Sequence, residues 1–132
     1  MKIVFFFLTF ILFFLTTTIN AQETIYFDAE WKITTKINAV YYRVEIQNKK
    51  AKTIDYFMSG KKAQEVVYMD GKPEGKYNLY YNSGELKTAG EYQKGLKQGV
   101  WKTYYKNGKI KERGRFKDDE KVGVWKTFYK NI

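Results

Sequence analysis

The residue types that most enzymes use for catalysis are scarce in this sequence. Its 132 residues include no histidine and no cysteine, which excludes Ser-His and Cys-His nucleophile systems and the usual zinc sites. Paired carboxylates are the remaining acid–base candidates, and the obvious cluster is Asp118, Asp119 and Glu120. The cluster falls in a predicted link between strands, where acidic side chains are normally just solvated, and its spacing is not that of a calcium loop. We therefore predict a protein that is not an enzyme and has no cofactor or metal.

A basic set of side chains could bind an anionic partner. Lysine and arginine number 24 against 14 acidic residues, and residues 99–132 hold ten of the basic residues and four of the acidic ones. The candidate set for binding anions or a partner is Lys102, Lys106, Lys109, Lys111, Arg113 and Arg115, extended by Lys126 and Lys130. The equivalent face 24 residues earlier holds one lysine, Lys87, against Glu85 and Glu91 and is not basic as a whole, so the patch is local. The alternative is a solvated face that only keeps an exposed sheet soluble.

Aromatic side chains form a second candidate set, a ladder of Tyr77, Tyr81, Trp101, Tyr105, Trp125 and Tyr129. The simpler interpretation is that these rings pack on one another as the core of the protein. A single-layered array can also leave part of such a ladder exposed, where it could stack on sugars or accept a partner's side chains. The sequence favours the core but leaves both interpretations open.

An internal repeat of 24 residues organises these side chains. Three glycine columns coincide at that shift, one at 75, 99 and 123, one at 60, 84 and 108, and one at 90 and 114. Trp101 matches Trp125, with Tyr77 one repeat earlier. The register holds from about residue 51 to residue 132. Repeats that stack on their neighbours share stability along the array.

Within a repeat the side chains alternate as in a β-strand, and Asn107-Gly108 separates two such runs. Asn-Gly is the strongest short hairpin signal because both residues tolerate a positive φ. A two-residue loop would set the pairs Lys106–Lys109, Tyr105–Ile110, Thr103–Glu112 and Trp101–Gly114. The Trp101 ring could then lie over the bare backbone of Gly114. We predict an all-β fold of tandem β-hairpins in an elongated, twisted antiparallel sheet.

The chain before the repeats divides into two further parts. Lys2, the apolar run from Ile3 to Leu15 and the small residue Ala21 have the pattern of a signal peptide cleaved at Ala21/Gln22. A minor alternative is an N-terminal membrane anchor, since 17 residues from Ile3 to Ile19 are at the lower limit for a span. We expect domains at 1–21 (signal peptide), 22–50 (an N-terminal β cap) and 51–132 (hairpin repeats). The cap should contain a strand at residues 40–46 and a turn at 47–50, with a returning strand at 52–57.

The segment from Gly99 to Phe116 resembles the bacterial variant of the MORN repeat, and the same spacing recurs from Gly75 to Tyr92. The resemblance covers roughly residues 51–132 and implies rows of β-hairpins. Proteins of this type are often labelled antitoxin components, and eukaryotic MORN proteins are linked with membranes, phospholipids and protein scaffolding. These are analogies at the level of the fold.

Together these features predict a non-catalytic cell-envelope protein that is exported to the periplasm or the cell exterior and binds another protein through its repeats. The alternative is peripheral binding of anionic lipid or polysaccharide through the basic set. A third function, an antitoxin-like inhibitor, is disfavoured by export, and so is binding of nucleic acid. The sequence does not identify the partner.

Overall fold

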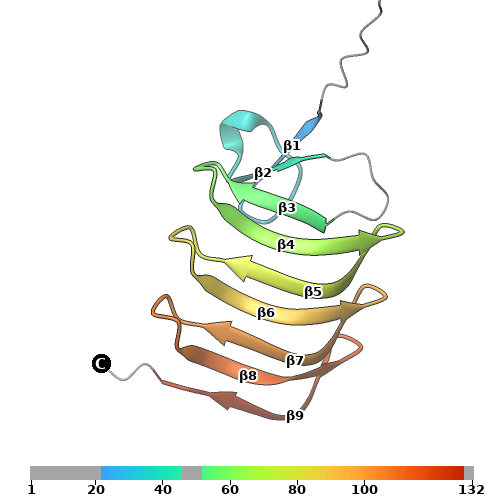
Figure 1. Cartoon of the computed structure of the whole chain (residues 1–132), viewed down its shortest axis with the longest axis vertical. Coiled ribbons are helices and arrows are strands. Elements are labelled where there is room, and N and C mark those ends of the chain that lie inside the picture. The colour runs from blue at the N-terminus through green and yellow to red at the C-terminus, as the bar shows by residue number, and fades with distance from the viewer. Residues whose placement is uncertain (1–21, 46–51, 130–132) are drawn as a thin grey trace, which may run out of the picture.

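The computed structural model describes residues 22–45 and 52–129 of the chain. These residues form one open antiparallel sheet of nine strands, in which each strand pairs with its neighbours in the sequence (Figure 1). The elements are β1 (Thr24–Phe27), the 3-10 helix η1 (Lys36–Asn38), β2 (Tyr41–Val44), β3 (Lys52–Phe57), β4 (Lys62–Met69), β5 (Lys72–Tyr80), β6 (Leu86–Gln93), β7 (Leu96–Tyr104), β8 (Ile110–Lys117) and β9 (Glu120–Thr127).

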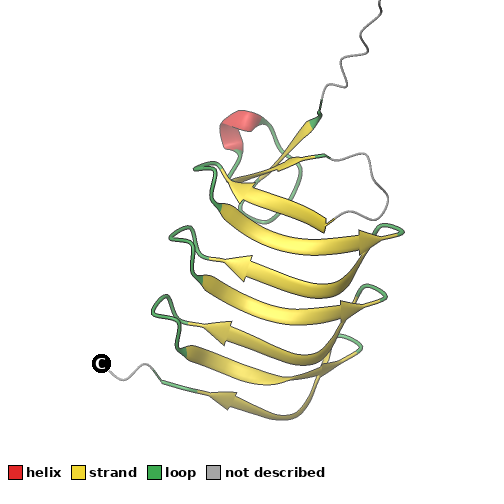
Figure 2. Cartoon of the chain, viewed as in Figure 1, coloured by secondary structure: helices red, strands yellow, loops and turns green. Residues whose placement is uncertain are grey.

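The 24-residue period of the sequence is also the period of the sheet. Strands β4, β6 and β8 begin at Lys62, Leu86 and Ile110, and β5, β7 and β9 begin 10 residues after each of these. The irregularities in pairing recur at the same spacing, between Ala89 and Glu91 and again between Arg113 and Arg115. The prediction of an all-β array of hairpin repeats is confirmed, and Figure 2 shows almost no helix.

The turn at Asn107-Gly108 is not the two-residue turn that was predicted. Gly108 N–H donates to the Tyr105 carbonyl (2.9 Å) and Tyr105 N–H donates to the Lys109 carbonyl (2.8 Å). Gly108 is the only residue of this loop with a positive φ, at 81°. A turn closed in this way, with one left-handed residue at its end, is the three-residue hairpin loop.

The longer loop changes the pairing next to the turn. Tyr104, not Tyr105, lies opposite Ile110, after a register shift that follows Thr103. The predicted pairs Trp101–Gly114 and Thr103–Glu112 are confirmed. The side chain of Tyr105 therefore belongs to the turn and not to the paired strand.

Tight two-residue turns occur instead in the links between hairpins. Asp118 and Asp119 both have a positive φ, of 50° and 68°, and the equivalent residues 94–95 and 70–71 do the same. This is the geometry of a type I′ turn, whose twist matches that of the flanking strands. Asp119 adopts it without being glycine, which carries a steric penalty.

The links hydrogen-bond to one another along the edge of the array. Asp119 N–H donates to the Lys97 carbonyl (3.1 Å), and the Asp119 carboxylate accepts the Lys97 N–H (2.7 Å). One repeat earlier Gly95 N–H donates to the Pro73 carbonyl (3.0 Å). Pro73 lies in β5. Gly95 and Pro73 are the equivalents of Asp119 and Lys97 in the earlier repeat. Because proline has no N–H, a carboxylate at position 95 would find no backbone donor at Pro73.

The N-terminal segment belongs to the same sheet as the repeats. The strand expected at residues 40–46 is β2, which is shorter, and the returning strand at 52–57 is β3. The turn expected at 47–50 and the whole of 1–21 lie outside the described residues. Because the sheet runs without a break from β1 to β9, the division into a cap and repeats stays a prediction.

The tryptophan rings pack on glycines, but on different ones than predicted. A Cβ on Gly90 would lie 2.2 Å from Trp101 Cδ2, and one on Gly114 would lie 2.1 Å from Trp125 Cδ2. Each ring thus covers the glycine of the hairpin before its own. The cause is a bulge, because Gly99–Trp101 together face the single residue Gly90 across the β6–β7 pair. Both glycines are packing positions, as expected, and each ring locks two neighbouring hairpins together.

A buried ion pair joins the first strands to the repeats. Arg43 in β2 holds Asp55 in β3 through two hydrogen bonds of 2.6 and 3.0 Å, and Asp55 is fully buried. Gln64 donates to the same carboxylate at 2.6 Å and accepts a hydrogen bond from the Tyr77 hydroxyl at 3.2 Å. Polar contacts therefore connect β2 to β5 and hold the ring of Tyr77 in place.

Candidate binding surfaces

A continuous chain of aromatic rings runs across β5 to β9 on one face of the sheet, which we call the aromatic face. Tyr77 contacts Tyr92 (5.5 Å between centroids), Tyr92 contacts Trp101 (5.2 Å), Trp101 contacts Phe116 (5.8 Å) and Phe116 contacts Trp125 (5.0 Å). Successive rings meet nearly edge to face, which is a favoured arrangement. Tyr77, Trp101 and Trp125 were predicted for the ladder. Tyr92 and Phe116 were not predicted, although Tyr68, Tyr92 and Phe116 are spaced 24 residues apart in the sequence.

The other three predicted ladder residues lie at the turns and not in the chain of rings. The Tyr81 hydroxyl donates to the Tyr104 carbonyl (2.7 Å), and the Tyr105 hydroxyl donates to the Phe128 carbonyl (2.9 Å). Each thus fastens one hairpin to the strand of the next. Tyr129, at the equivalent position in the last repeat, is 86% exposed.

Lysines cover the outer sides of the two tryptophans. Lys97 Nζ lies 4.9 Å from the Trp101 centroid and 5.0 Å from that of Phe116, and Lys121 Nζ lies 4.1 Å from Trp125. Ammonium groups over aromatic rings are attracted by the ring quadrupole. Trp101, packed between Gly90 and Lys97, is only 4% exposed. Its ring is therefore part of the core.

The two indole N–H groups differ in their hydrogen bonding. Trp101 Nε1 donates to the Gln98 carbonyl (3.1 Å). Trp125 Nε1 is buried and has no hydrogen-bond acceptor among the residues that the structure describes. A buried donor without a partner is destabilising, so the last repeat is less well satisfied than the one before it.

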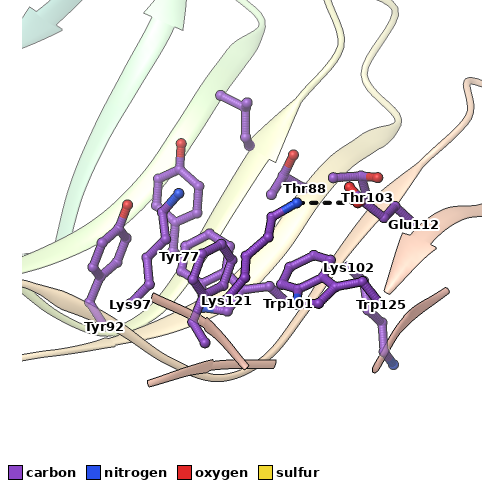
Figure 3. Close-up of a pocket in the computed structure, with 12 residues that line it drawn as sticks. Tyr77, Thr88, Tyr92, Lys97, Trp101, Lys102, Thr103, Glu112, Lys121 and Trp125 are labelled. Atoms are coloured by element: carbon purple, nitrogen blue, oxygen red, sulfur yellow. Dashed lines mark hydrogen bonds and ion pairs between the residues drawn. The ribbon is translucent and has the colours of Figure 1, made fainter. Parts of the chain in front are cut away.

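An open groove of about 340 Å³ lies on the aromatic face, above the chain of rings (Figure 3). Its polar side chains include Thr88, Thr103, Lys97, Lys121 and Glu112, and Lys102 borders it. Lys121 forms an ion pair with Glu112 at 3.4 Å and extends over the groove. The remaining lining residues are Tyr77, Leu79, Tyr92, Trp101, Phe116 and Trp125.

The tyrosines of the groove keep their protons at neutral pH. Burial raises the pKa of Tyr77 and of Tyr92 above the usual value for a phenol. The groove therefore offers neutral hydroxyls, ammonium groups and a wall of rings. This combination suits a ligand with both apolar and anionic groups, and it contains no acid–base pair poised for catalysis.

The opposite face of the last strands carries part of the predicted basic set. Lys102 in β7 lies directly opposite Arg113 in β8, and Arg113 lies opposite Lys126 in β9. None of these three forms an ion pair with a carboxylate of residues 22–45 or 52–129. Like charges directly opposite each other are destabilising. We call Lys102, Arg113 and Lys126 the basic row.

The other predicted basic residues do not extend this row. Lys106 and Lys109 belong to the turn, and Lys106 Nζ lies 5.7 Å from the Tyr81 ring. Lys111 Nζ lies 5.9 Å from the Tyr105 ring. Arg115 lies one pair further along β8, opposite Val100 and Val122. Lys130 lies outside the described residues.

The acidic cluster at 118–120 has a structural role in the link between β8 and β9. The carboxylate of Asp118 accepts a hydrogen bond from the Gln98 side chain, and that of Asp119 accepts the Lys97 N–H. In the part of the chain that the structure describes, no group of three or more His, Cys, Asp or Glu side chains could hold a metal ion. No helix among these described residues is long and apolar enough to cross a membrane.

Comparison with known proteins gives one match. Residues 97–118 match the family described as the MORN repeat variant, and these residues hold almost all of β7 and the whole of β8. No curated protein and no solved structure matches the chain at the threshold of the comparison. MORN repeats are generally modules that bind proteins or membranes, and the family is typically non-catalytic. The hairpin β7–β8 is thus similar to a repeat of the MORN variant.

Proposed function

We propose that this chain is a non-catalytic module that binds a partner protein in the groove of the aromatic face. The observation that carries the proposal is the groove itself, which lies open beside a wall of packed rings. Trp101 and its neighbours are held by the glycine contacts and by Lys97, so the wall is rigid before any partner arrives. A rigid surface with few rotamers to fix loses little entropy on binding.

The charge of the groove favours an acidic, extended segment of the partner. Lys97 and Lys121 line it, whereas Glu112 is its one acidic side chain and is already paired with Lys121. Carboxylates of a partner could take the place of Glu112 on Lys121 and bind Lys97. Aliphatic parts of the same segment would cover Phe116 and Trp125.

We also propose that the protein is exported and acts in the cell envelope. The support is the basic, apolar and small-residue pattern of residues 1–21. N-terminal sequencing of the protein expressed with its own first 21 residues tests this. A mature chain that begins at Gln22 is expected, and a chain that keeps residues 1–21 would contradict the proposal.

Photo-crosslinking distinguishes the groove from the rest of the surface. A photo-reactive amino acid at Thr103 lies in the groove, and one at Asn78 lies on the opposite face of the sheet, in a hollow that it shares with Ala89 and Val100. We expect one dominant protein adduct from Thr103 that persists at high salt, and none from Asn78. Equal adducts from both positions, or none from Thr103, would refute a groove-centred interface.

A second candidate function is peripheral binding of an anionic lipid or polysaccharide through the basic row. The observation in its favour is that Lys102, Arg113 and Lys126 face one another and form no ion pair within the described part of the chain. Such binding should be lost at high salt, because exposed charges are screened within about 10 Å at 0.1 M ionic strength. Flotation with anionic vesicles at low and high salt tests it, with Arg113→Glu as the variant. Binding that survives high salt, or that Arg113→Glu leaves intact, would contradict this second function.

A further inference from the structure

The outer edge of β9 is open in the described part of the chain. Strand order ends at β9, which pairs only with β8 among these residues. Val124 on this strand is 79% exposed and Val122 is 37% exposed. An open edge presents a row of unpaired N–H and C=O groups that can pair with another strand.

The other edge of the sheet is partly covered. In the connection from β1 to β2, Ile33 forms an antiparallel bridge with Phe27, and Thr34 N–H donates to the Tyr26 carbonyl at 2.9 Å. The loop thus covers the outer edge of β1 at Tyr26 and Phe27. Among residues 22–45 and 52–129, no such cover lies on the outer edge of β9.

The edge of β9 has the shape that accepts an antiparallel strand. Its equivalents β5 and β7 also contain a positive-φ glycine, Gly75 and Gly99, yet their outer edges pair regularly through it. Gly75 pairs with Tyr92, Gly99 pairs with Phe116, and the next residues follow in step. By the 24-residue period, β9 offers the same edge from Gly123 onwards. Before the glycine, Lys97 in β7, which is equivalent to Lys121, directs its carbonyl and its N–H outward to Asp119, so Lys121 has outward backbone groups as well.

The side chains of β9 are complementary to themselves. We propose that two copies of this chain pair β9 to β9 in antiparallel orientation, about a two-fold axis that passes beside Gly123. On the face of the basic row, Glu120 then lies opposite Lys126 of the second copy, and Val122 lies opposite Val124. On the aromatic face, Lys121 lies opposite Trp125 of the second copy. Every charged or apolar residue of the strand meets a suitable partner, and each pair occurs twice.

This complementarity is confined to the strand whose edge is open. The first and seventh residues of β9 are Glu120 and Lys126, whereas those of β7 are Leu96 and Lys102. The corresponding residues of β5 are Lys72 and Asn78, so neither inner strand has the acidic and basic ends that self-pairing needs. Because a two-fold pairing uses the β9 edge of both copies, it closes as a dimer.

Sedimentation analysis over a range of protein concentrations tests the proposal. We expect a monomer–dimer equilibrium, since a seam of seven residues from each copy is a small interface. Glu120→Lys or Lys126→Glu places like charges opposite each other twice and should weaken the dimer about tenfold. The double variant with both changes should restore it, which a general loss of stability would not do. Lys102→Glu, an equivalent change in β7, should leave the dimer unaffected. A protein that stays monomeric at every concentration, or a charge swap that fails to rescue, would overturn the proposal.

Disulfide trapping determines the register, because the chain has no cysteine of its own. Val122→Cys and Val124→Cys proteins are oxidised separately and as an equimolar mixture. The proposed register predicts a crosslink mainly between unlike chains in the mixture. Efficient self-crosslinking of Val124→Cys alone would indicate a register shifted by one pair, and no crosslink in any sample would overturn the pairing of the two strands.

Discussion

Replacing Gly90 by alanine should displace the Trp101 ring. The new Cβ would lie 2.2 Å from Trp101 Cδ2 and Cε2, whereas carbon atoms in contact are about 3.5–4.0 Å apart. The ring would have to move by roughly 1.5 Å, but Lys97 lies above it and Tyr92 and Phe116 meet its edges. We expect a loss in the free energy of unfolding of about 3 kcal/mol, between the cost of overpacking and that of removing a buried tryptophan.

A double-mutant cycle isolates this contact. In a Trp101→Ala background the clash is gone, and Gly90→Ala should cost nothing or stabilise the strand by about 0.5–1 kcal/mol, because alanine has less backbone freedom to lose than glycine. Urea unfolding followed by circular dichroism gives the four free energies, and we expect a coupling of about 3 kcal/mol. Equal effects of Gly90→Ala in both backgrounds would refute the reasoning.

The same cycle shows which glycine each ring covers. Gly114→Ala should keep its full effect in the Trp101→Ala background and lose it in Trp125→Ala. If Trp101→Ala relieved Gly114→Ala instead, the ring would cover the glycine of its own hairpin. We expect Gly114→Ala to destabilise less than Gly90→Ala, because Trp125 is less buried than Trp101.

Three further outcomes follow from buried and strained groups. Hydrogen bonds from Lys62, Lys52 and Tyr80 lower the pKa of Glu65 from 4.5 to about 2, so stability should be full above pH 4.5 and fall by at most about 3 kcal/mol towards pH 2. A Glu65→Gln protein should lack that part of the slope in pH-dependent urea titrations. Asp55→Ala should lower the free energy of unfolding by about 3–5 kcal/mol because it leaves Arg43 unpaired, and the double variant Arg43→Met with Asp55→Leu should recover most of it in the same denaturation assay. Full stability of the single variant would contradict this. Asp119→Ala should destabilise about 1 kcal/mol more than Asp119→Gly, because alanine tolerates the positive φ less well, and thermal melting that ranks the two variants in the opposite order would be inconsistent with the strained turn.

The architecture could be predicted because one period fixes both the strands and their order. Columns of glycine and aromatic residues 24 apart predicted hairpins, and β4 to β9 have that spacing. The pair Trp101–Gly114 could also be predicted, since alternation places both residues on one face. Tyr92 and Phe116 are also 24 residues apart, so the complete chain of rings could have been predicted from the sequence.

The direction of the rings could not be read from the pairing. A bulge at Gly99 places three residues opposite Gly90 and turns Trp101 towards the preceding hairpin. A glycine inside a strand pattern can mark a bulge, but it does not give the direction in which the next side chain turns. The Asn-Gly signal was similarly ambiguous, because Asn107 keeps a negative φ when the loop has three residues. That extra loop residue moved Tyr105, Lys106 and Lys109 into the turn and divided the predicted basic set.

The proposed binding groove is tested most directly by filling it. Thr103→Trp adds a large side chain to the groove without replacing a residue of the ring wall, and Asn78→Trp makes the same change on the opposite face. The affinity of each variant for the protein crosslinked at Thr103 is measured by calorimetry, after melting curves have shown that both variants fold. We expect Thr103→Trp to bind at least about tenfold more weakly, a loss of about 1.4 kcal/mol, while Asn78→Trp binds like the unchanged protein. Full affinity of Thr103→Trp would show that the partner does not bind in the groove.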